Sequence, residues 1–302
     1  MLVGRAHGEP NEEINVEETV VLGQLVLVAT PLGNLGDLSR RALELFRIAD
    51  VIYCEDTRHS RTLFSAHDIP TGGRLQSLHE HNEAAQCAMI VERVRAGELV
   101  VLISDAGTPG ISDPGSRVVA AVARAGLRVT TAPGPSAVIA ALTISGLSTE
   151  RFVMEGFLPR KSGERALIYK QWEHEERTTV FYESPQRVKS VLAELSLLWP
   201  GRRVAVAREM TKLHEEVVRG TLEEVATQIA ARDVLGEIVI VLEGVTNEAP
   251  VIDNRVILAA LSEQIESGAS TRDAVDFVAE VLGVARRDVY QLALDARKGE
   301  SS

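Results

Sequence analysis

The chain has only two cysteines among its 302 residues, Cys54 and Cys87, and neither belongs to a Cys-x-x-Cys pair or a zinc-type Cys/His pattern. We therefore expect free thiols in a reducing compartment, with no disulfide framework and no metal site. The longest stretch without a charged residue, 129–149, is interrupted by prolines and glycines. It predicts a strand, a loop and a buried helix rather than a membrane span, and hence a soluble cytoplasmic protein.

Three common glycine-rich ligand loops are also missing. No Gly-x-Gly-x-x-Gly follows the first apolar run, and Gly-x-x-x-x-Gly-Lys-Ser/Thr does not occur. These absences argue against a dinucleotide-binding fingerprint and against a P-loop phosphate site. The glycine-rich first loop of the common Rossmann-like methyltransferases is absent as well. A ligand site in this chain must therefore be of a less common type.

What the chain does have is a proline- and glycine-rich loop, 104–115, between an apolar run and a helical pattern. The run 99–103 predicts a buried strand, and Asp113 followed by Pro114 predicts a helix N-cap and a first-turn proline. Glycine lets a backbone approach a ligand closely, and proline stiffens it. A single loop of this kind is equally compatible with a structural turn.

The same strand–loop–helix arrangement occurs twice more. Residues 25–29 precede the loop 30–36, and residues 127–131 precede the loop 132–136, again with proline and glycine at each crossing. Such crossings lie at the carboxyl ends of the strands, where open α/β sheets bind ligands. The repetition predicts one composite pocket lined by backbone, although α/β loops are often glycine-rich for structural reasons alone.

Alternating strand and helix patterns predict two α/β domains, 24–134 and 135–244, with sheets covered on both faces. Residues 204–208 and 216–220 predict an antiparallel hairpin at one sheet edge. The acidic segment 1–23 lacks the basic start and apolar core of a signal peptide, and we expect a disordered leader.

Residues 253–297, after a linker, predict three helices that resemble a helix-turn-helix, with Ser270 opening a capping box. The net charge of −11 weighs against nucleic-acid binding by the whole surface. However, residues 151–219 carry thirteen Lys/Arg against ten Asp/Glu. A local basic face is therefore compatible with the sequence.

Eight segments carry a resemblance to a known family: 30–35 (Thr-Pro-Leu-Gly-Asn-Leu), 55–59 (Glu-Asp-Thr-Arg-His), 79–82 (His-Glu-His-Asn), 104–115, 133–136 (Pro-Gly-Pro-Ser), 155–159 (Glu-Gly-Phe-Leu-Pro), 181–184 (Phe-Tyr-Glu-Ser) and 208–212 (Arg-Glu-Met-Thr-Lys). Together they resemble the tetrapyrrole-methylase-like (class III) methyltransferases. More narrowly, they resemble the branch that methylates the ribose 2′-oxygen of a cytidine in small-subunit (16S) ribosomal RNA near the decoding centre. The resemblance covers about 24–297, and Met210 stands where leucine is expected.

The resemblance implies two α/β domains with S-adenosylmethionine in the cleft between them. It also implies a homodimer, with small-subunit ribosomal RNA or the 30S subunit as the partner. The cofactor contacts that it implies are Pro31, Asp105, Gly107, Thr108, Ile111, Ser112, Pro133 and Ser136 from the first domain and the crossover, and Phe181, Tyr182, Ala207 and Ile238 from the second.

Methyl transfer needs mostly positioning and exclusion of water, whereas a ribose hydroxyl also needs help to lose its proton. The catalytic candidates are Asp56, Glu183 and Lys212. Asp56 and Glu183 come just after predicted strands, at the edge where a sheet meets its ligand. Either carboxylate could instead cap a helix or form a hydrogen bond at the domain interface.

Basic and polar residues beside the motifs are candidates for contacts with RNA. They are Arg58, His79, Asn82, Lys161, Arg187, Arg208, Arg286 and Arg287. Taken singly, charged side chains of this kind are usually ordinary residues of the solvated surface. His79 and His81 could equally hold a loop, and a metal site there lacks an evident third ligand.

Two other functions fit parts of the sequence. A methylase of a tetrapyrrole precursor would share the three crossings but would have little use for the helical tail and a basic second domain. A non-catalytic ribosomal RNA assembly factor would keep only a vestigial pocket, whereas the three loops here are intact.

Overall fold

The structure, a computed structural model, describes residues 23–245 and 253–299. The chain forms two compact units, Met1–Gly244 and Val245–Ser302. Both expected α/β parts belong to the first unit, as two separate sheets. The expected leader, apart from Gly23, lies outside the described residues.

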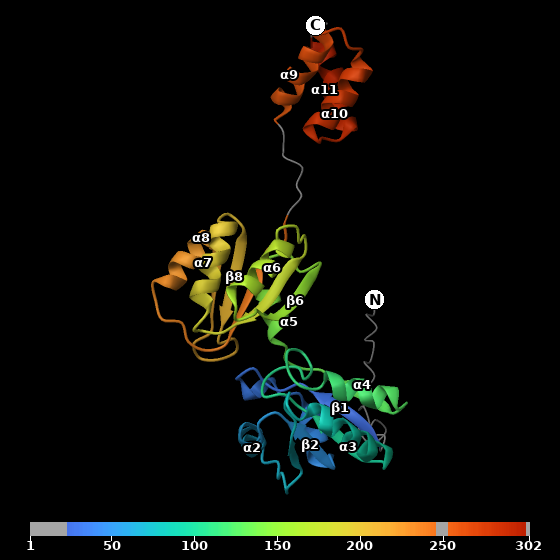
Figure 1. The fold of residues 1–302 in the computed structure, drawn as a ribbon, viewed down its shortest axis with the longest axis vertical. Coiled ribbons are helices and arrows are strands. Elements are labelled where there is room, and N and C mark those ends of the chain that lie inside the picture. The colour runs from blue at the N-terminus through green and yellow to red at the C-terminus, as the bar shows by residue number, and fades with distance from the viewer. Residues whose placement is uncertain (1–22, 246–252, 300–302) are drawn as a thin grey trace, which may run out of the picture. The chain divides into compact units, whose positions relative to one another are not determined.

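The first sheet is entirely parallel, with the strand order β3-β2-β4-β1-β5 (Figure 1). Its strands are β1 Gln24–Val28, β2 Val51–Cys54, β3 Leu75–Ser77, β4 Leu99–Leu102 and β5 Arg128–Ala132. Its helices are η2 Leu35–Asp37, α1 Arg40–Ile48, α2 Thr57–Ala66, α3 Glu83–Arg95 and α4 Ser116–Arg124. Helices α1 and α2 pack Phe46 and Phe64 on one face, and α3 and α4 pack Ile90 and Val122 on the other. Burial on both faces explains why β2 and β4 are continuous apolar runs.

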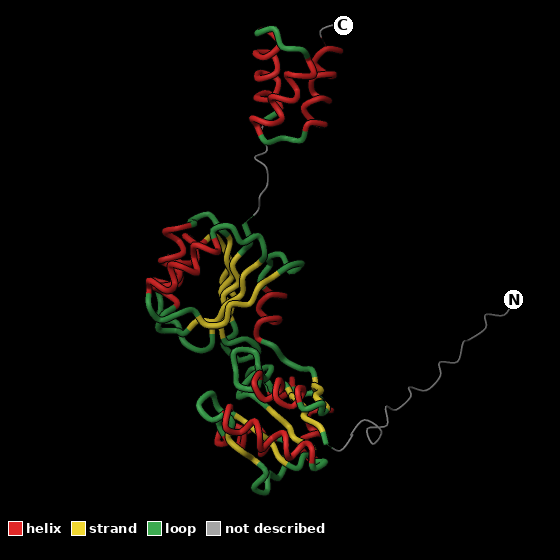
Figure 2. The backbone as a smooth tube through the Cα atoms, turned by 45° about the vertical axis from the view of Figure 1, so that its right-hand side comes forward, coloured by secondary structure: helices red, strands yellow, loops and turns green. Residues whose placement is uncertain are grey.

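The second sheet is mixed, with the order β6-β7-β10-β8-β9. Its strands are β6 Phe152–Phe157, β7 Thr178–Glu183, β8 Arg203–Arg208, β9 Glu216–Thr221 and β10 Ile238–Leu242. Its helices are α5 Ala137–Ile144, α6 Ser162–Trp172, α7 Val188–Leu198 and α8 Leu222–Ala230. Helices α6, α7 and α8 cover one face and α5 the other, and the tube in Figure 2 shows the strands between helices. The predicted edge hairpin is confirmed, because β8 and β9 pair antiparallel.

The start of α4 differs from the sequence prediction. Asp113 does not cap this helix, which begins at Ser116 after Gly115 at a φ of 137°. The cap comes from another helix, because Glu83 Oε1 accepts the backbone N–H groups of Gly115 and Arg117 at 2.9 and 3.0 Å. Asp113 is therefore free of the capping role that its position before a proline suggested.

The second unit contains three helices, α9 Asn254–Glu266, α10 Thr271–Leu282 and α11 Arg286–Gly299. They share one apolar core that includes Leu261, Val275 and Val289. The Ser270 hydroxyl accepts the N–H of Asp273 as predicted, but the Asp273 carboxylate accepts from that hydroxyl, so the reciprocal half of a capping box is not made. Among the helices of 23–245 and 253–299, none has the length and apolar character that a membrane crossing requires.

Candidate functional site

A cavity of about 360 Å³ lies in the first unit, where residues of both sheets come together. Its volume is within the range of small-molecule sites in proteins. One side is the loop after β4, from Asp105 to Asp113, and the other is formed by the end of β7 and the start of β10. Of the twelve predicted cofactor contacts, eight line it: Asp105, Gly107, Thr108, Ile111, Ser112, Ser136, Tyr182 and Ile238.

Hydrogen bonds join the three proline- and glycine-rich crossings at this cavity. The backbones of Thr30 and Gly107 exchange two hydrogen bonds, of 2.8 and 3.0 Å. The Thr108 hydroxyl donates to the carbonyl of Pro135 at 3.0 Å, which joins the third crossing to the second. Gly107 has a φ of 79°, and a Cβ there would be 3.3 Å from Leu32 Cδ2. The predicted convergence of the three loops on one pocket is confirmed.

Four expected cofactor contacts do not line the cavity. Pro31 is buried and Pro133 is exposed, each within one of the crossings. Phe181 is fully buried and packs its ring 5.1 Å from that of Trp172. Ala207 lies in the core beneath α5. Side chains alternate along a strand, so Phe181 points to the opposite face from Tyr182, whereas Ala207 shares the face of Tyr182 and is covered by α5.

The sequence interpretation missed nine lining residues: Leu32, Ala106, Asp113, Ala137, Phe157, Ser184, Met210, Glu237 and Val239. Val239 pairs with Tyr182 and with Ala207 in the sheet, so all three share one face, of which Tyr182 and Val239 line the cavity. Phe157 is 60% exposed, and its ring centroid lies 5.3 Å from that of Tyr182. The motif 155–159 was the available signal for Phe157, since it carries a large aromatic at a strand end.

Acidic groups gather at the first-sheet side of the cavity. Burial raises the pKa of Asp113 to about 6, and the nearby charge of Glu55 adds to this effect. Burial and the charge of Asp105 likewise raise the pKa of Glu55. Burial, with a contribution from Asp113, raises the pKa of Tyr182 to about 12. Concentrated negative charge in a half-buried site favours a positively charged ligand.

Asp56 does not line the cavity. Its carboxylate caps α2 by accepting the N–H of Arg58 at 2.8 Å, and it pairs with the Arg58 guanidinium at 3.2 Å. Hydrogen bonds from Arg58 lower the pKa of Asp56 below its usual range. The capping alternative is the one observed, and a base role for Asp56 has no geometric support.

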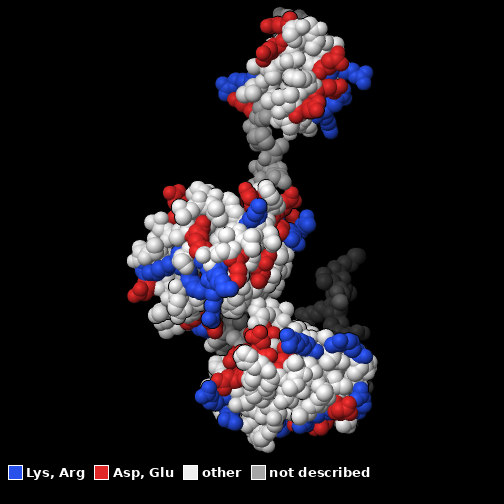
Figure 3. All heavy atoms as spheres, viewed as in Figure 1, with Lys and Arg blue, Asp and Glu red and all other residues white. Residues whose placement is uncertain are grey.

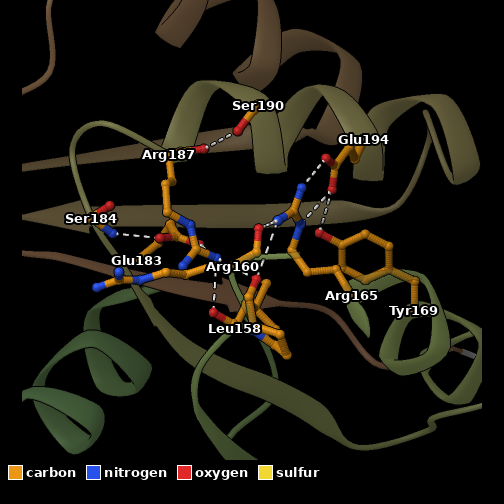
Figure 4. A network of polar contacts seen from close by, with 10 residues as sticks. Leu158, Arg160, Arg165, Tyr169, Glu183, Ser184, Arg187, Ser190 and Glu194 are labelled. Atoms are coloured by element: carbon orange, nitrogen blue, oxygen red, sulfur yellow. Dashed lines mark hydrogen bonds and ion pairs between the residues drawn. The ribbon is translucent and has the colours of Figure 1, made fainter. Parts of the chain in front are cut away.

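Glu183 lines the cavity, but its carboxylate is held by neighbours (Figure 4). Its side chain is fully buried, and Oε1 accepts the N–H of Ser184 at 2.7 Å. Oε2 lies 3.1 Å from Nη2 of Arg187, a close ion pair without the alignment of a hydrogen bond. Arg187 Nη2 also donates to the carbonyls of Leu158 and Pro159 at 2.9 and 3.0 Å. The phosphate-binding role expected of Arg187 is therefore corrected to a structural one.

Lys212 bridges two carboxylates at the edge of the cavity. Its Nζ lies 3.0 Å from Glu209 Oε1 and 3.1 Å from Glu237 Oε2, and Glu237 lines the cavity. Burial lowers the pKa of Lys212, but hydrogen bonds to Glu209 and Glu237 outweigh that effect and raise it overall. A lysine held as an ammonium ion cannot accept a proton, so Lys212 is not the base that the sequence suggested.

Several residues expected to contact RNA have partners within the protein. Asn82 Oδ1 accepts the N–H of His79 at 2.8 Å, and its amide nitrogen donates to Ser77 at 3.0 Å, so this pair holds a loop. The others pair with acids: Arg208 with Glu216 at 2.6 Å, Lys161 with Glu164 at 3.0 Å, and Arg286 with Asp276. Arg287 is exposed. Lysine and arginine gather on one face of the second sheet's half of the first unit (Figure 3).

Comparisons with known proteins agree with this architecture. The sequence model of the tetrapyrrole (corrin/porphyrin) methylases matches residues 24–226. The chain belongs to the tetrapyrrole methylase family. A structure of diphthine synthase matches 73% of the chain with a TM-score of 0.56 at 16% identity, covering 89% of that chain. A uroporphyrin-III C-methyltransferase of Thermus thermophilus, complexed with S-adenosyl homocysteine, matches 73% of the chain with a TM-score of 0.51 at 20% identity, covering 96% of that chain.

Nearer relatives of this tetrapyrrole methylase family member share one name. The ribosomal RNA small subunit methyltransferase I of Mycobacterium tuberculosis is 44% identical over 278 residues, which are 91% of this chain and 96% of that protein. The protein of the same name from Xylella fastidiosa is 43% identical over 273 residues, covering 89% and 98%. The chain is thus a methyltransferase that uses S-adenosylmethionine as its methyl donor.

Proposed function

We propose that the protein methylates the ribose 2′-oxygen of a cytidine in small-subunit (16S) ribosomal RNA, as a cytoplasmic homodimer, and that the donor binds in the cavity between the two sheets. The observation that carries this proposal is the identity of 44% to a ribosomal RNA small subunit methyltransferase I over 91% of the chain. The three crossings, which hydrogen bonds join to one another, would form the part of the site that binds the methyl donor.

The cavity residues fit S-adenosylmethionine. Its ammonium and sulfonium groups are positive, and the carboxyl groups of Asp105 and Asp113 line the cavity. Ile111, Ile238 and Met210 provide apolar surface for the rest of the molecule. When bound, the cofactor supplies a methyl group already activated by positively charged sulfur. The main contributions of the protein are therefore to position the reactants and to exclude water. Leu32 and Phe157 would keep water from the reacting atoms.

RNA would reach the cavity from the side of Phe157, which is exposed, and of the half-buried Tyr182 beside it. Bases of single-stranded RNA stack on aromatic side chains, and a splayed-out nucleotide presents its ribose to the site. Arg287 is exposed, and so are Arg58 and Arg286, whose ion pairs with Asp56 and Asp276 lie at the surface and are therefore weak. These cations would contact phosphates and position the RNA.

The proposed homodimer is supported by apolar surface on α5. This helix is apolar almost throughout, and Ile139 is exposed although other residues of α5 are buried. Phe152, at the start of β6, is also partly exposed. Exposed apolar side chains of this size on neighbouring segments are typical of surfaces that a second subunit covers.

Mass spectrometry of ribosomal RNA tests the proposal. A strain lacking the protein should lose one 2′-O-methylcytidine from small-subunit RNA, and the wild-type gene should restore it. Purified protein with labelled donor should transfer label to small subunits from that strain and not to uroporphyrinogen. Label in uroporphyrinogen would favour the tetrapyrrole alternative, and failure to bind the donor would favour a non-catalytic assembly factor.

A further inference from the structure

Four carboxyl groups line the cavity, and three of them are held by donors within the protein. These pairs are Asp105 Oδ1 with the N–H of Asp56 at 3.2 Å, Glu183 with the N–H of Ser184 and with Arg187, and Glu237 with Lys212 at 3.1 Å. A carboxylate that already accepts a hydrogen bond or pairs with a cation is a weaker proton acceptor. The fourth group is Asp113.

Asp113 has no comparable partner. Within 23–245 and 253–299, no lysine or arginine lies at ion-pair distance from it. The polar group beside it is the neutral hydroxyl of Ser104, which donates to the carbonyls of Ala106 and Gly107 at 3.3 Å. Among the described carboxyl groups of the cavity, Asp113 is therefore the one that has neither a cation nor a backbone N–H as its partner.

The position of Asp113 matches the side from which a nucleotide would enter. It lies close enough to Tyr182 for its charge to affect that hydroxyl. Its neighbour Ser112 lies against the bulge in β6, where a Cβ on Gly156 would be 3.4 Å from the serine Oγ. The aromatic residue Phe157 follows that bulge directly. Asp113 thus belongs to the loop after β4 and lies near the wall of the second sheet that carries the two aromatic rings.

We propose that Asp113 accepts the proton of the ribose 2′-hydroxyl during methyl transfer. This inference rests on the proposed function and adds the catalytic residue to it. As the 2′-oxygen forms its bond to the methyl carbon, the carbon–sulfur bond breaks and its electron pair stays on sulfur, which becomes a neutral thioether. The hydroxyl proton passes to the Asp113 carboxylate and is later released to solvent, so no other reactant is needed.

The surroundings of Asp113 suit this role at physiological pH. The groups that face it are Glu55 after β2, Ser104 and Asp105 after β4, and Tyr182 on β7. Burial raises its pKa to about 6, with Glu55 as the next cause. A base must be ionised to act, so the rate rises with pH through this pKa and levels off above it. The positive sulfonium of a bound donor favours the ionised form, which moves the inflection to pH 6 or below.

The experiment compares the wild type with Asp113→Asn, which keeps the shape of the side chain but cannot accept the proton. Asp68→Asn is the matched control, because Asp68 is exposed and its φ of 53° suits asparagine equally well. Single-turnover methyl transfer to small ribosomal subunits is measured from pH 5 to 8.5. Donor affinity is measured by calorimetry and folding by thermal melting.

We expect Asp113→Asn to lower the rate by roughly 10²–10⁴-fold and to abolish the pH inflection, with a melting temperature near that of the wild type. Asp68→Asn should match the wild type throughout. A rate for Asp113→Asn within threefold of an active wild type would overturn this inference and leave the proposed function standing. If Asp113→Asn does not fold, a wild-type rate that stays flat from pH 5 to 8 would overturn it instead. If the wild-type protein transfers no methyl group to any small ribosomal subunit, both the proposed function and the role of Asp113 are overturned.

Discussion

Glu83, the first residue of α3, caps a neighbouring helix: its Oε1 lies 2.9 Å from the backbone nitrogen of Gly115. Gly115 has no side chain that could serve α4 as a cap. The loop 104–115 is therefore anchored at its end by a buried carboxylate from α3, a helix that packs against the first sheet. One side chain links the stability of α4 to the shape of the cavity.

Glu83→Ala should destabilise the protein by about 1–3 kcal/mol, since it leaves buried N–H groups without their acceptor. It should also weaken donor binding, because the cavity loop loses its anchor. Urea unfolding and calorimetry measure the two effects. Glu92→Ala on the same helix removes an exposed carboxylate paired with Arg95 and should cost less than about 0.5 kcal/mol. Equal losses for both variants would contradict the capping role.

Gly107→Ala should reduce donor affinity at least tenfold. The residue has a φ of 79°, and the new Cβ would lie 3.3 Å from Leu32 within the cavity. Gly73→Ala is the matched control, because Gly73 has a φ of 81° and open space around it. Both variants should melt at a slightly lower temperature from backbone strain, and only Gly107→Ala should lose affinity. Unchanged affinity for both would show that the donor binds elsewhere.

Arg187→Ala should cost about 3 kcal/mol in the free energy of unfolding, the lower end of the range for breaking a buried ion pair, because it leaves the Glu183 carboxylate without its cation. The double variant Arg187→Ala with Glu183→Gln should recover part of this loss. Denaturant titrations of the three variants give the coupling energy. Wild-type stability in Arg187→Ala, together with a raised KM for RNA, would restore the phosphate-binding role.

Glu216 should make folding sensitive to acid. Hydrogen bonds from Arg232 and Arg208 lower its pKa in the folded state. Its contribution to stability is therefore fully present above the usual glutamate pKa and is lost as the pH falls through the lowered value. Unfolding measured from pH 7 to pH 2 should show a wild-type advantage over Glu216→Gln at neutral pH that disappears in acid. A difference that does not change with pH would refute this linkage.

Phe157→Ala should raise the KM for ribosomal subunits, by the equivalent of about 1–3 kcal/mol for a lost stacking contact. Donor affinity should change less than the KM. Leu197→Ala serves as the control, because Leu197 is 86% exposed on α7 and does not line the cavity. The assignment fails if Phe157→Ala weakens donor binding as much as it raises the KM.

Local sequence patterns were enough to predict the strands and helices of both sheets. Buried parallel strands read as short apolar runs, as in 51–54 and 99–102. The prolines and glycines of the three crossings also predicted where the cavity lies. Backbone geometry at these turns depends on residues that are close in the sequence, so the turns could be predicted from one sequence.

Side-chain partners from distant segments could not be predicted in the same way. An acid before a proline, as at Asp113, is typical of a helix start. The residue that caps α4 is instead Glu83, which lies 32 residues before Gly115 in the sequence. Glu183 and Arg187 are one helical turn apart, but their mutual burial depends on the loop at Leu158. Packing between segments that are distant in the sequence decides which charged groups are held in ion pairs or hydrogen bonds and which remain reactive.

The paired hydrogen bonds between Thr30 and Gly107 have a kinetic consequence. These bonds join two of the loops on the first-sheet side of the cleft before the donor binds, so capture of the donor should involve little loss of loop entropy. Association should then follow a single exponential whose rate constant grows linearly with donor concentration, without the plateau that a slow closing step produces.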